Sequence, residues 1–196
     1  MTPYYETPLG KLYHGDCLEI MPELEPVDLV LTDPPYKQEI ARIDFRVTTI
    51  YFLESIESRQ YVFWGGSEKF PLSYTSKHKW VKLNGFGGKG YEEIYERNGG
   101  KTNKTFFAPS INSIVSARMA GDTYVKHPTQ KPKKLFLSIL LNQDSDLTLD
   151  PFLGSGTTAI ACERLKRSWI GIEIEEKYCE IAAKRIEQER KQRKLF

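Results

Sequence analysis

The chain has 196 residues, enough for one domain with a substantial hydrophobic core. Its formal net charge is +2, and 40% of its residues are hydrophobic and 28% charged, a composition typical of soluble globular proteins. No run approaches the roughly 18 apolar residues of a membrane span, and the N-terminus lacks a signal-peptide pattern, so we expect a cytoplasmic protein without a membrane partner.

Cysteine and histidine are too scattered to indicate a disulfide framework or a metal centre. Cys17, Cys162 and Cys179 include no C-x-x-C pair, and the histidines at 14, 78 and 127 are far apart in the sequence. Isolated cysteines suit a reducing cytoplasm. Without a cluster of cysteine or histidine ligands, we expect no metal.

Short apolar runs and helical periodicities alternate along the chain. The predicted strands are 11–16, 27–32, 61–66, 79–84, 91–96, 147–150 and 168–174. The predicted helices are 17–24, 131–143, 157–166 and 175–194. This alternation predicts an α/β fold with a Rossmann-like, doubly wound and mostly parallel sheet, formed by residues 1–196 as a single domain. Residues 98–126 are polar and weakly periodic, which predicts a loop region or short insertion over the sheet's edge.

The second predicted strand ends in Asp33-Pro34-Pro35-Tyr36. Each proline lacks an N–H and restricts φ, and Pro35 also keeps Pro34 out of helix. The chain is therefore expected to leave the sheet as a stiff elbow that holds a carboxylate, backbone carbonyls and an aromatic ring in fixed positions. Taken alone, the four residues favour an ordinary turn with Tyr36 packed on the surface.

A second motif follows the strand that ends in "LTLD". Gly154-x-Gly156-x-x-Ala159 fits the G-x-G-x-x-G/A pattern, in which small residues allow a tight turn and close approach of a ligand. The helix that begins near Thr157 presents free N–H groups. Glu173 ends the next strand, where an acid accepts hydrogen bonds from ribose hydroxyls. The segment predicts a site for an adenosine-bearing cofactor; the alternative is a tight turn that only packs the helix on the sheet.

The Asp-Pro-Pro-Tyr elbow favours methyl transfer over hydride transfer, which has no use for a carboxylate at this position. The exocyclic amine of a nucleobase is a poor nucleophile because its lone pair is delocalised into the ring. The Asp33 carboxylate and the Pro34 carbonyl are suited to accept its two N–H bonds, and Tyr36 is suited to stack on the base. The base must first leave its duplex, which costs a few kcal/mol.

Three motifs together resemble a known family: "DPPY" at 33–36, "HPTQKP" at 127–132 and "DPFLGSGTT" at 150–158. In this order, with the catalytic motif before the cofactor motif, they resemble the beta class of DNA amino-methyltransferases, the adenine-N6 and cytosine-N4 family. The resemblance covers nearly the whole chain. It implies the circularly permuted methyltransferase fold, S-adenosyl-L-methionine as cofactor and DNA as partner.

The resemblance also assigns roles to individual residues. It implies that the catalytic residues are Asp33, Pro34, Pro35 and Tyr36. The implied cofactor contacts are Asp16, Asp33, Thr129, Gln130, Lys131, Asp150, Phe152, Gly154, Ser155, Gly156, Thr157, Thr158 and Glu173. Among these, Asp16 falls near the cofactor's adenine, and residues 129–131 close the pocket beside its methionine portion. Either Glu92 or Glu93 fits the place of a later acid, although a solvated strand face is an equally good explanation of both.

The sequence gives less direct information about how the protein binds DNA. Basic residues crowd 77–82, 100–105, 126–134 and 190–194, and several of them are interleaved with aromatic residues such as Trp80 and Phe106, as in nucleic-acid grooves. The alternative is that these residues only solvate the surface, and it is the better explanation for the tail. Only residues 37–60 separate Tyr36 from the next predicted strand, and the short polar segment 98–126 is the one candidate for a reduced target-recognition segment. We therefore expect a homodimer or a partner subunit. The alternative is relaxed selectivity through backbone contacts, which depends strongly on salt.

The expected function is DNA methylation at the N6 amino group of adenine in a restriction-modification setting. In the resembling family an acid at the first motif position leans toward adenine, whereas serine leans toward cytosine. Methylation of the cytosine N4 amino group is the first alternative. RNA or protein methylation and a non-catalytic partner subunit are further alternatives.

Overall fold

The computed structural model describes residues 1–35, 50–65, 69–83, 90–125 and 130–193. Its strands form one mixed sheet in the order β1-β2-β9-β8-β3-β4-β6-β5-β7. The strands are β1 (Tyr5–Glu6), β2 (Gly10–His14), β3 (Leu29–Thr32), β4 (Arg59–Trp64), β5 (Ser76–Lys82), β6 (Tyr91–Arg97), β7 (Thr105–Ala108), β8 (Leu147–Asp150) and β9 (Ser168–Glu173).

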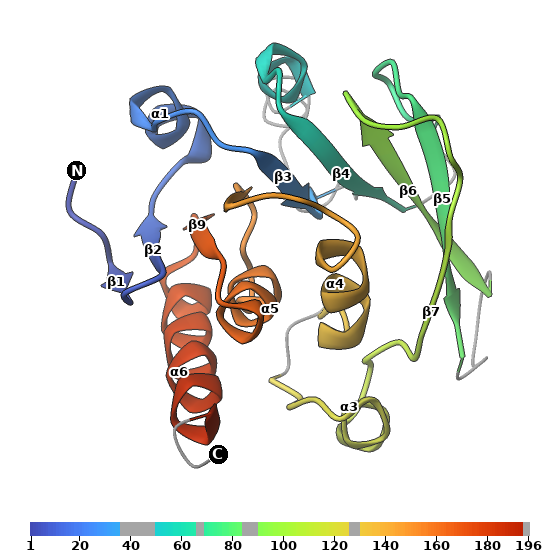
Figure 1. The fold of residues 1–196 in the computed structure, drawn as a ribbon. Coiled ribbons are helices and arrows are strands. Elements are labelled where there is room, and N and C mark those ends of the chain that lie inside the picture. Colours follow the sequence, from blue (N-terminus) through green and yellow to red (C-terminus); the bar gives the residue numbers. More distant parts are fainter. Residues whose placement is uncertain (36–49, 66–68, 84–89, 126–129, 194–196) are drawn as a thin grey trace.

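Helices cover both faces of this sheet, as the predicted doubly wound fold requires. They are α1 (Cys17–Ile20), the 3₁₀ helix η1 (Met21–Glu23), α3 (Ile114–Ala120), α4 (Lys133–Leu140), α5 (Thr157–Leu165) and α6 (Glu176–Arg193). Figure 1 shows α4, α5 and α6 on one face of the sheet and α1 on the other, where the helical residues 50–55 also lie. The predicted α/β fold class is confirmed.

Five neighbouring strands, β2, β9, β8, β3 and β4, run parallel to one another. Their carboxyl ends therefore meet at one edge, which is where ligands bind in open α/β sheets. Beyond β4 the sheet is mixed, because β6 runs antiparallel to both β4 and β5. The expectation of a mostly parallel sheet holds for the part that carries both sequence motifs.

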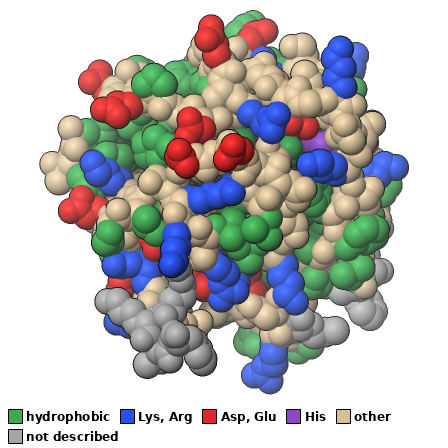
Figure 2. All heavy atoms as spheres, viewed as in Figure 1, with side chains coloured by type: hydrophobic (Ala, Val, Ile, Leu, Met, Phe, Trp, Pro, Cys, Tyr) green, Lys and Arg blue, Asp and Glu red, His purple; other side chains and the backbone are tan. Residues whose placement is uncertain are grey.

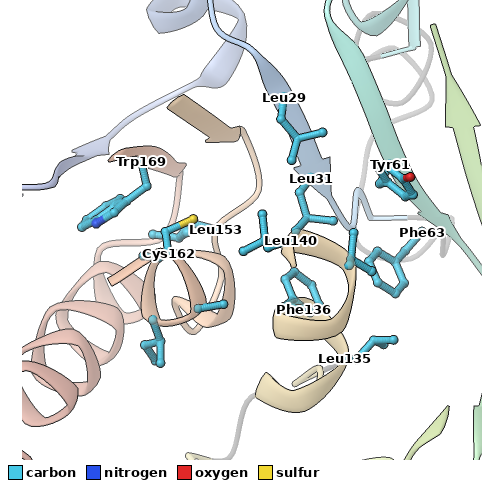
Figure 3. Close-up of a cluster of buried hydrophobic side chains, with 14 of the residues drawn as sticks. Leu29, Leu31, Tyr61, Phe63, Leu135, Phe136, Leu140, Leu153, Cys162 and Trp169 are labelled. Atoms are coloured by element: carbon cyan, nitrogen blue, oxygen red, sulfur yellow. The ribbon is translucent and has the colours of Figure 1, made fainter. Parts of the chain in front are cut away.

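The core lies on both faces of the central strands. Along β3, Leu29 and Leu31 contact the cluster under α4 and α5, whereas Val30 belongs to the opposite cluster with α1. This alternation follows from the two-residue period of a strand. Figure 3 shows the first cluster, in which the Phe63 and Phe136 rings stack 5.2 Å apart. Burying each such side chain stabilises the fold by about 1.5–3 kcal/mol, so β3 is a rigid base for Asp33.

The structure differs from two local predictions. Residues 98–126 were expected to be a loop region or a short insertion over the sheet's edge; they contain more regular structure than a loop, namely β7, which pairs with β5 as the last strand of the sheet, and α3. A capping box formed by Ser113 and Ser116 begins α3, and Gly121 with a positive φ ends it. The helix predicted for 17–24 is α only over Cys17–Ile20, because Pro22 converts the rest to a 3₁₀ turn.

Among the residues that the structure describes, no helix is both long enough and apolar enough to cross a membrane.

Candidate active site

The Asp-Pro-Pro elbow follows β3 directly at the carboxyl edge of the sheet. Residues 33–35 have neither helical nor strand structure; Pro34 is buried, and Asp33 and Pro35 are half-buried. Because β3 lies between β8 and β4 with parallel pairing on both sides, this edge position is set by four buried strand residues. Tyr36, the fourth residue of the predicted catalytic group, lies outside the described residues.

Asp33 uses its two carboxylate oxygens differently. Oδ2 lies 2.5 Å from Lys131 Nζ, in an ion pair whose side chains are only 15% and 7% exposed. Oδ1 is buried and has no hydrogen-bond partner among the described residues. Burial raises the pKa of Asp33 above its ordinary value, and the Lys131 ammonium opposes this rise without cancelling it. A buried acceptor without a partner is costly, so Oδ1 marks the place where a donor from a ligand would fit.

The glycine loop connects β8 to α5 and has the tight turn that the sequence predicts. Gly154 and Gly156 adopt φ values of +54° and +84°, which side chains rarely adopt. At Gly156 a Cβ would lie 3.0 Å from Ala182 Cβ of α6. Gly156 is thus required for packing against α6, which explains part of the motif without a ligand.

Asp150 organises this loop from the inside. Its Oδ1 accepts hydrogen bonds from Thr32 Oγ1 at 3.0 Å and from Phe152 N at 3.1 Å, and its Oδ2 accepts one from Thr158 Oγ1. Burial raises the pKa of Asp150 to about 7, although these three donors oppose the rise. The carboxylate therefore joins β3, β8 and α5, and Phe152 beside it is half-buried.

Glu173 and Asp16 follow the next two strands at the same edge. Glu173 Oε2 accepts a hydrogen bond from Gly154 N at 2.8 Å, and its Oε1 accepts one from Glu175 N at 2.9 Å. Each oxygen keeps a second lone pair for a further donor. Asp16 caps α1 by accepting from Leu18 N at 2.9 Å. The pairing of His14 with Glu173 in the register of β2 and β9 places these two acids at the same edge of the sheet.

Gln130 stabilises the segment that precedes it. Its amide accepts from Val125 N at 3.1 Å and donates to Thr123 O at 2.6 Å. The neighbouring Lys131 carbonyl accepts from Thr157 Oγ1 at 3.3 Å, which joins this segment to the start of α5. Thr129 lies outside the described residues.

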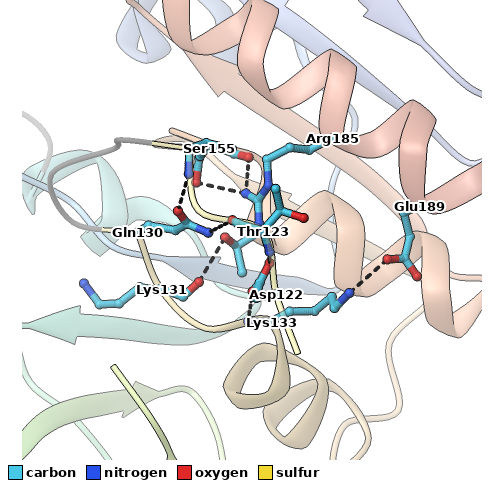
Figure 4. Close-up of polar contacts among 10 residues, drawn as sticks. Asp122, Thr123, Gln130, Lys131, Lys133, Ser155, Arg185 and Glu189 are labelled. Atoms are coloured by element: carbon cyan, nitrogen blue, oxygen red, sulfur yellow. Dashed lines mark hydrogen bonds and ion pairs between the residues drawn. The ribbon is translucent and has the colours of Figure 1, made fainter. Parts of the chain in front are cut away.

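A buried arginine of α6 fastens this segment to the glycine loop (Figure 4). Arg185 donates to Ser155 O at 2.5 Å and to Ser155 Oγ at 3.0 Å, and it pairs with Asp122 Oδ1 at 3.0 Å. Asp122 Oδ2 also accepts from Lys133 N at 2.9 Å. Sequence analysis missed Arg185 and Asp122. The sequence did contain a signal for Arg185, because this residue lies beside Ala182 and Ile186 on the apolar face of α6, where a buried arginine needs a partner.

The structure also separates Glu92 from Glu93. Glu92 lies 2.7 Å from Lys82 Nζ and 3.9 Å from Lys131 Nζ, toward the elbow. Glu93 accepts from Tyr95 Oη and pairs with Lys77, on the other face of β6. Strand alternation places adjacent residues on opposite faces, so only Glu92 belongs to the site.

Comparisons with known proteins agree with this geometry. The N6/N4 methylase family model, described as DNA methylase, matches residues 66–184. The chain belongs to this DNA methylase family. Type II methyltransferase M2.DpnII of Streptococcus pneumoniae is 44% identical over 101 residues, which are 50% of this chain and 36% of that protein. The chain thus spans about a third of the length of this curated relative.

Solved structures support the DNA methylase fold over most of the chain. The M1.HpyAVI–SAM complex matches with a TM-score of 0.64 and 25% identity, over 91% of this chain and 99% of that one. The PvuII DNA methyltransferase, titled cytosine-N4-specific, matches with a TM-score of 0.64 at 19% identity, over 93% and 88% of the two chains. At that identity the second likeness shows the fold alone.

The surface of this DNA methylase is mixed in charge. Figure 2 shows lysine and arginine side chains spread over the lower and right-hand parts of one face, where Figure 1 places α3, α4 and the β5–β7 end of the sheet. Acidic side chains gather mainly in the upper left. The basic part of this face is the part suited to a polyanion.

Proposed function

We propose that this chain is an S-adenosylmethionine-dependent DNA methyltransferase that methylates the N6 amino group of adenine. The observation that carries the proposal is Asp33 Oδ1, a buried acceptor without a partner among the described residues, on a rigid Pro-Pro elbow at the carboxyl edge of the sheet. Family membership and the likeness to the M1.HpyAVI–SAM complex support the cofactor.

Residues at the edge fit the proposed cofactor. We propose that Glu173 accepts hydrogen bonds from the ribose hydroxyls and that Asp16, which follows the adjacent strand β2, lies near the adenine end. Gly154 is buried and has no side chain, and it lies next to the first turn of α5, so we propose that the cofactor approaches the loop backbone closely there. When bound, S-adenosylmethionine supplies an electrophilic methyl group on a sulfonium. We propose that Asp150, Ser155, Gly156, Thr157 and Thr158 act by shaping this loop and that Phe152 lines it.

The elbow's role in the reaction is to grip the target amine. Asp33 Oδ1 and the Pro34 carbonyl accept its N–H bonds and favour the pyramidal nitrogen whose lone pair attacks. Formation of the N–C bond would go with cleavage of the methyl carbon–sulfur bond, whose electron pair would stay on sulfur, and it would leave positive charge on the nitrogen. The Asp33 carboxylate stabilises this charge more in the transition state than in the ground state. The nitrogen then releases one proton to solvent, and Tyr36 is proposed to stack on the flipped base.

The remaining assignments concern the whole chain. We propose that residues 1–196 form one catalytic domain, in which 98–126, with β7 and α3, is a reduced target-recognition segment. DNA is the proposed partner, with a second copy or another subunit completing the recognition surface, and the cytoplasm is the proposed location. Cytosine N4 is the alternative target, because the PvuII cytosine-N4 enzyme has the same fold.

The decisive experiment is methylation of duplex DNA with tritiated cofactor, followed by nucleoside analysis. Tritium in N6-methyladenine is the expected result, and it should disappear with Asp33→Ala. Label in N4-methylcytosine would replace the adenine assignment. Label in RNA or protein, or in no substrate at all, would overturn the proposed function.

A further inference from the structure

A row of alternating charges leads from the elbow to the far strands of the sheet. Asp33 Oδ2 lies 2.5 Å from Lys131 Nζ, Lys131 Nζ lies 3.9 Å from Glu92 Oε2, and Lys82 Nζ lies 2.7 Å from Glu92 Oε1. The four residues come from the end of β3, the segment before α4, β6 and β5. Their side chains are 7–24% exposed, so solvent screens these contacts only in part.

The main chain of Lys131 is held independently of its charge. Its carbonyl accepts from Thr157 Oγ1, and the preceding Gln130 is anchored to residues 123 and 125. Figure 4 shows the Lys131 side chain extending away from the Arg185 contacts. Its stem passes Phe63, with Nζ 5.6 Å from the ring centroid. The ammonium group is therefore directed at Asp33 by a fixed backbone and an apolar wall.

The Asp33–Lys131 ion pair gives the two carboxylate oxygens of Asp33 different environments. Three charged groups face Asp33: Lys131 before α4, Glu92 on β6 and Asp150 at the end of β8. Burial and Glu92 both raise the pKa of Asp33, and Lys131 is the group that lowers it. Without the lysine, a buried acid beside two other acids takes up a proton readily. A protonated carboxyl is a poorer acceptor for an amine.

We propose that Lys131 is a positioning residue that holds Asp33 as a charged acceptor through Oδ2 and so leaves Oδ1 for the target amine, with Glu92 and Lys82 holding the lysine in place. This role rests on the proposed amino-methyl transfer. It differs from a contact with the methionine portion of the cofactor, which is the role that the family resemblance implies for Lys131.

The first test needs neither cofactor nor activity. The Asp33 carboxyl is titrated by ¹³C NMR in aspartate-labelled protein, with Asp33→Asn used to assign its signal. In Lys131→Met the pKa of Asp33 is expected to rise by roughly 1–3 units, the effect of removing an adjacent opposite charge. Lys131→Arg keeps the charge and should leave the titration close to wild type. An unchanged titration in Lys131→Met overturns the proposal.

The matched control is Lys133→Met. Lys133 is in the same segment, but its Nζ pairs with Glu189 at 3.0 Å, and Glu189 keeps Arg164 as a second partner. The Asp33 titration should be unchanged in this variant. If Lys131→Met does not fold, the pKa of Asp33 is compared between Lys131→Arg, which keeps the charge, and Lys131→Gln, which removes it.

The second test is the pH profile of single-turnover methylation. The ionised carboxylate is the active form, so the rate falls as pH drops through the pKa of Asp33. In Lys131→Met the midpoint of this acid limb should move to higher pH by the shift seen by NMR. Most of the rate should be recovered at high pH, and the cofactor Kd should stay within about threefold of wild type. Loss of cofactor affinity at every pH, with an unmoved limb, would instead make Lys131 a cofactor ligand. A wild-type protein that methylates nothing refutes the proposed function, while the NMR titration still decides the role of Lys131.

Discussion

At the scale of single residues, the site separates atoms that build it from atoms left for a ligand. The Asp150 carboxylate is occupied by Thr32, Phe152 N and Thr158, whereas Asp33 keeps Oδ1 without a partner among the described residues. Two acids that follow neighbouring parallel strands thus have different roles. The difference lies in the number of internal donors, which a motif does not reveal.

Asp33 is the residue on which turnover should depend most. Asp33→Ala removes the acceptor and the charge, and we expect a loss of at least ~10²-fold in the single-turnover rate, as for deletion of one preorganised group. Asp33→Asn keeps the shape but loses the charge, so it should also be severely impaired, with cofactor affinity changing far less. Single-turnover kinetics with saturating DNA and cofactor is the measurement. An Asp33→Ala rate within a few-fold of wild type would show that the elbow is only a turn.

Gly156 should matter for stability before it matters for ligands. Gly156→Ala places a side chain at φ +84°, 3.0 Å from Ala182 Cβ. We expect a loss of about 1–3 kcal/mol in the free energy of unfolding, the usual cost of backbone strain, measured by chemical denaturation. Gly100→Ala is the control, because a Cβ there meets nothing within 4 Å. Equal stability of the two variants would argue against a packing role for Gly156.

At the scale of elements, α6 holds the glycine loop and the segment after α3 together. Arg185 reaches from its buried stripe to Ser155 and Asp122, and both members of the Arg185–Asp122 pair are about 95% buried. Three pieces of chain far apart in sequence therefore depend on one guanidinium. The helix contributes to the site without touching the reacting atoms.

Removing this guanidinium should loosen both segments. Arg185→Met leaves Asp122 without its charged partner, and we expect a loss of about 3–5 kcal/mol in unfolding free energy, typical of a broken buried pair. Cofactor affinity, measured by calorimetry, should fall with it. Lys184→Met is the control on the same helix, because Lys184 pairs with Glu180 in an exposed contact. If the two variants proved equally stable, the Arg185 contacts would be incidental.

At the scale of the whole molecule, the segment that we propose to read DNA is short. The described part of 98–126 is used for β7, which completes the sheet, and for α3, which has a small core of its own. The chain matches only 36% of the length of a curated relative. We propose that so short a segment needs additional surface to select a DNA sequence.

We therefore predict that the active species is a dimer or requires a second subunit. Light scattering over a micromolar concentration series, with and without duplex DNA, should show a mass above that of one chain in the active state. Methylation rate should then rise more steeply than protein concentration when the protein acts alone. A strict monomer that methylates one specific sequence by itself would contradict the prediction.

The sequence by itself determined the fold class, the two motifs and the elements that carry them. Buried parallel strands and amphipathic helices have strong local periodicities, so β3, β8, β9, α4, α5 and α6 were predicted close to their observed bounds. The glycine turn and its acid were also predictable, because the positive φ values and the strand end are local properties. β7 was missed because its pairing with β5 depends on a distant neighbour rather than on its own pattern.

Only the tertiary structure decided which charged groups meet. Lys131 was predicted to contact the cofactor, which stays a prediction, and the structure shows that it also reaches Asp33, 98 residues away in sequence. The choice of Glu92 over Glu93 and the anchoring of the loop by Arg185 were likewise decided by strand register and helix packing. Contacts between such distant positions depend on side-chain direction and burial, which short-range sequence patterns do not encode. For that reason the motifs could be predicted from the sequence, whereas the ion pairs that Lys131, Glu92 and Arg185 make could not.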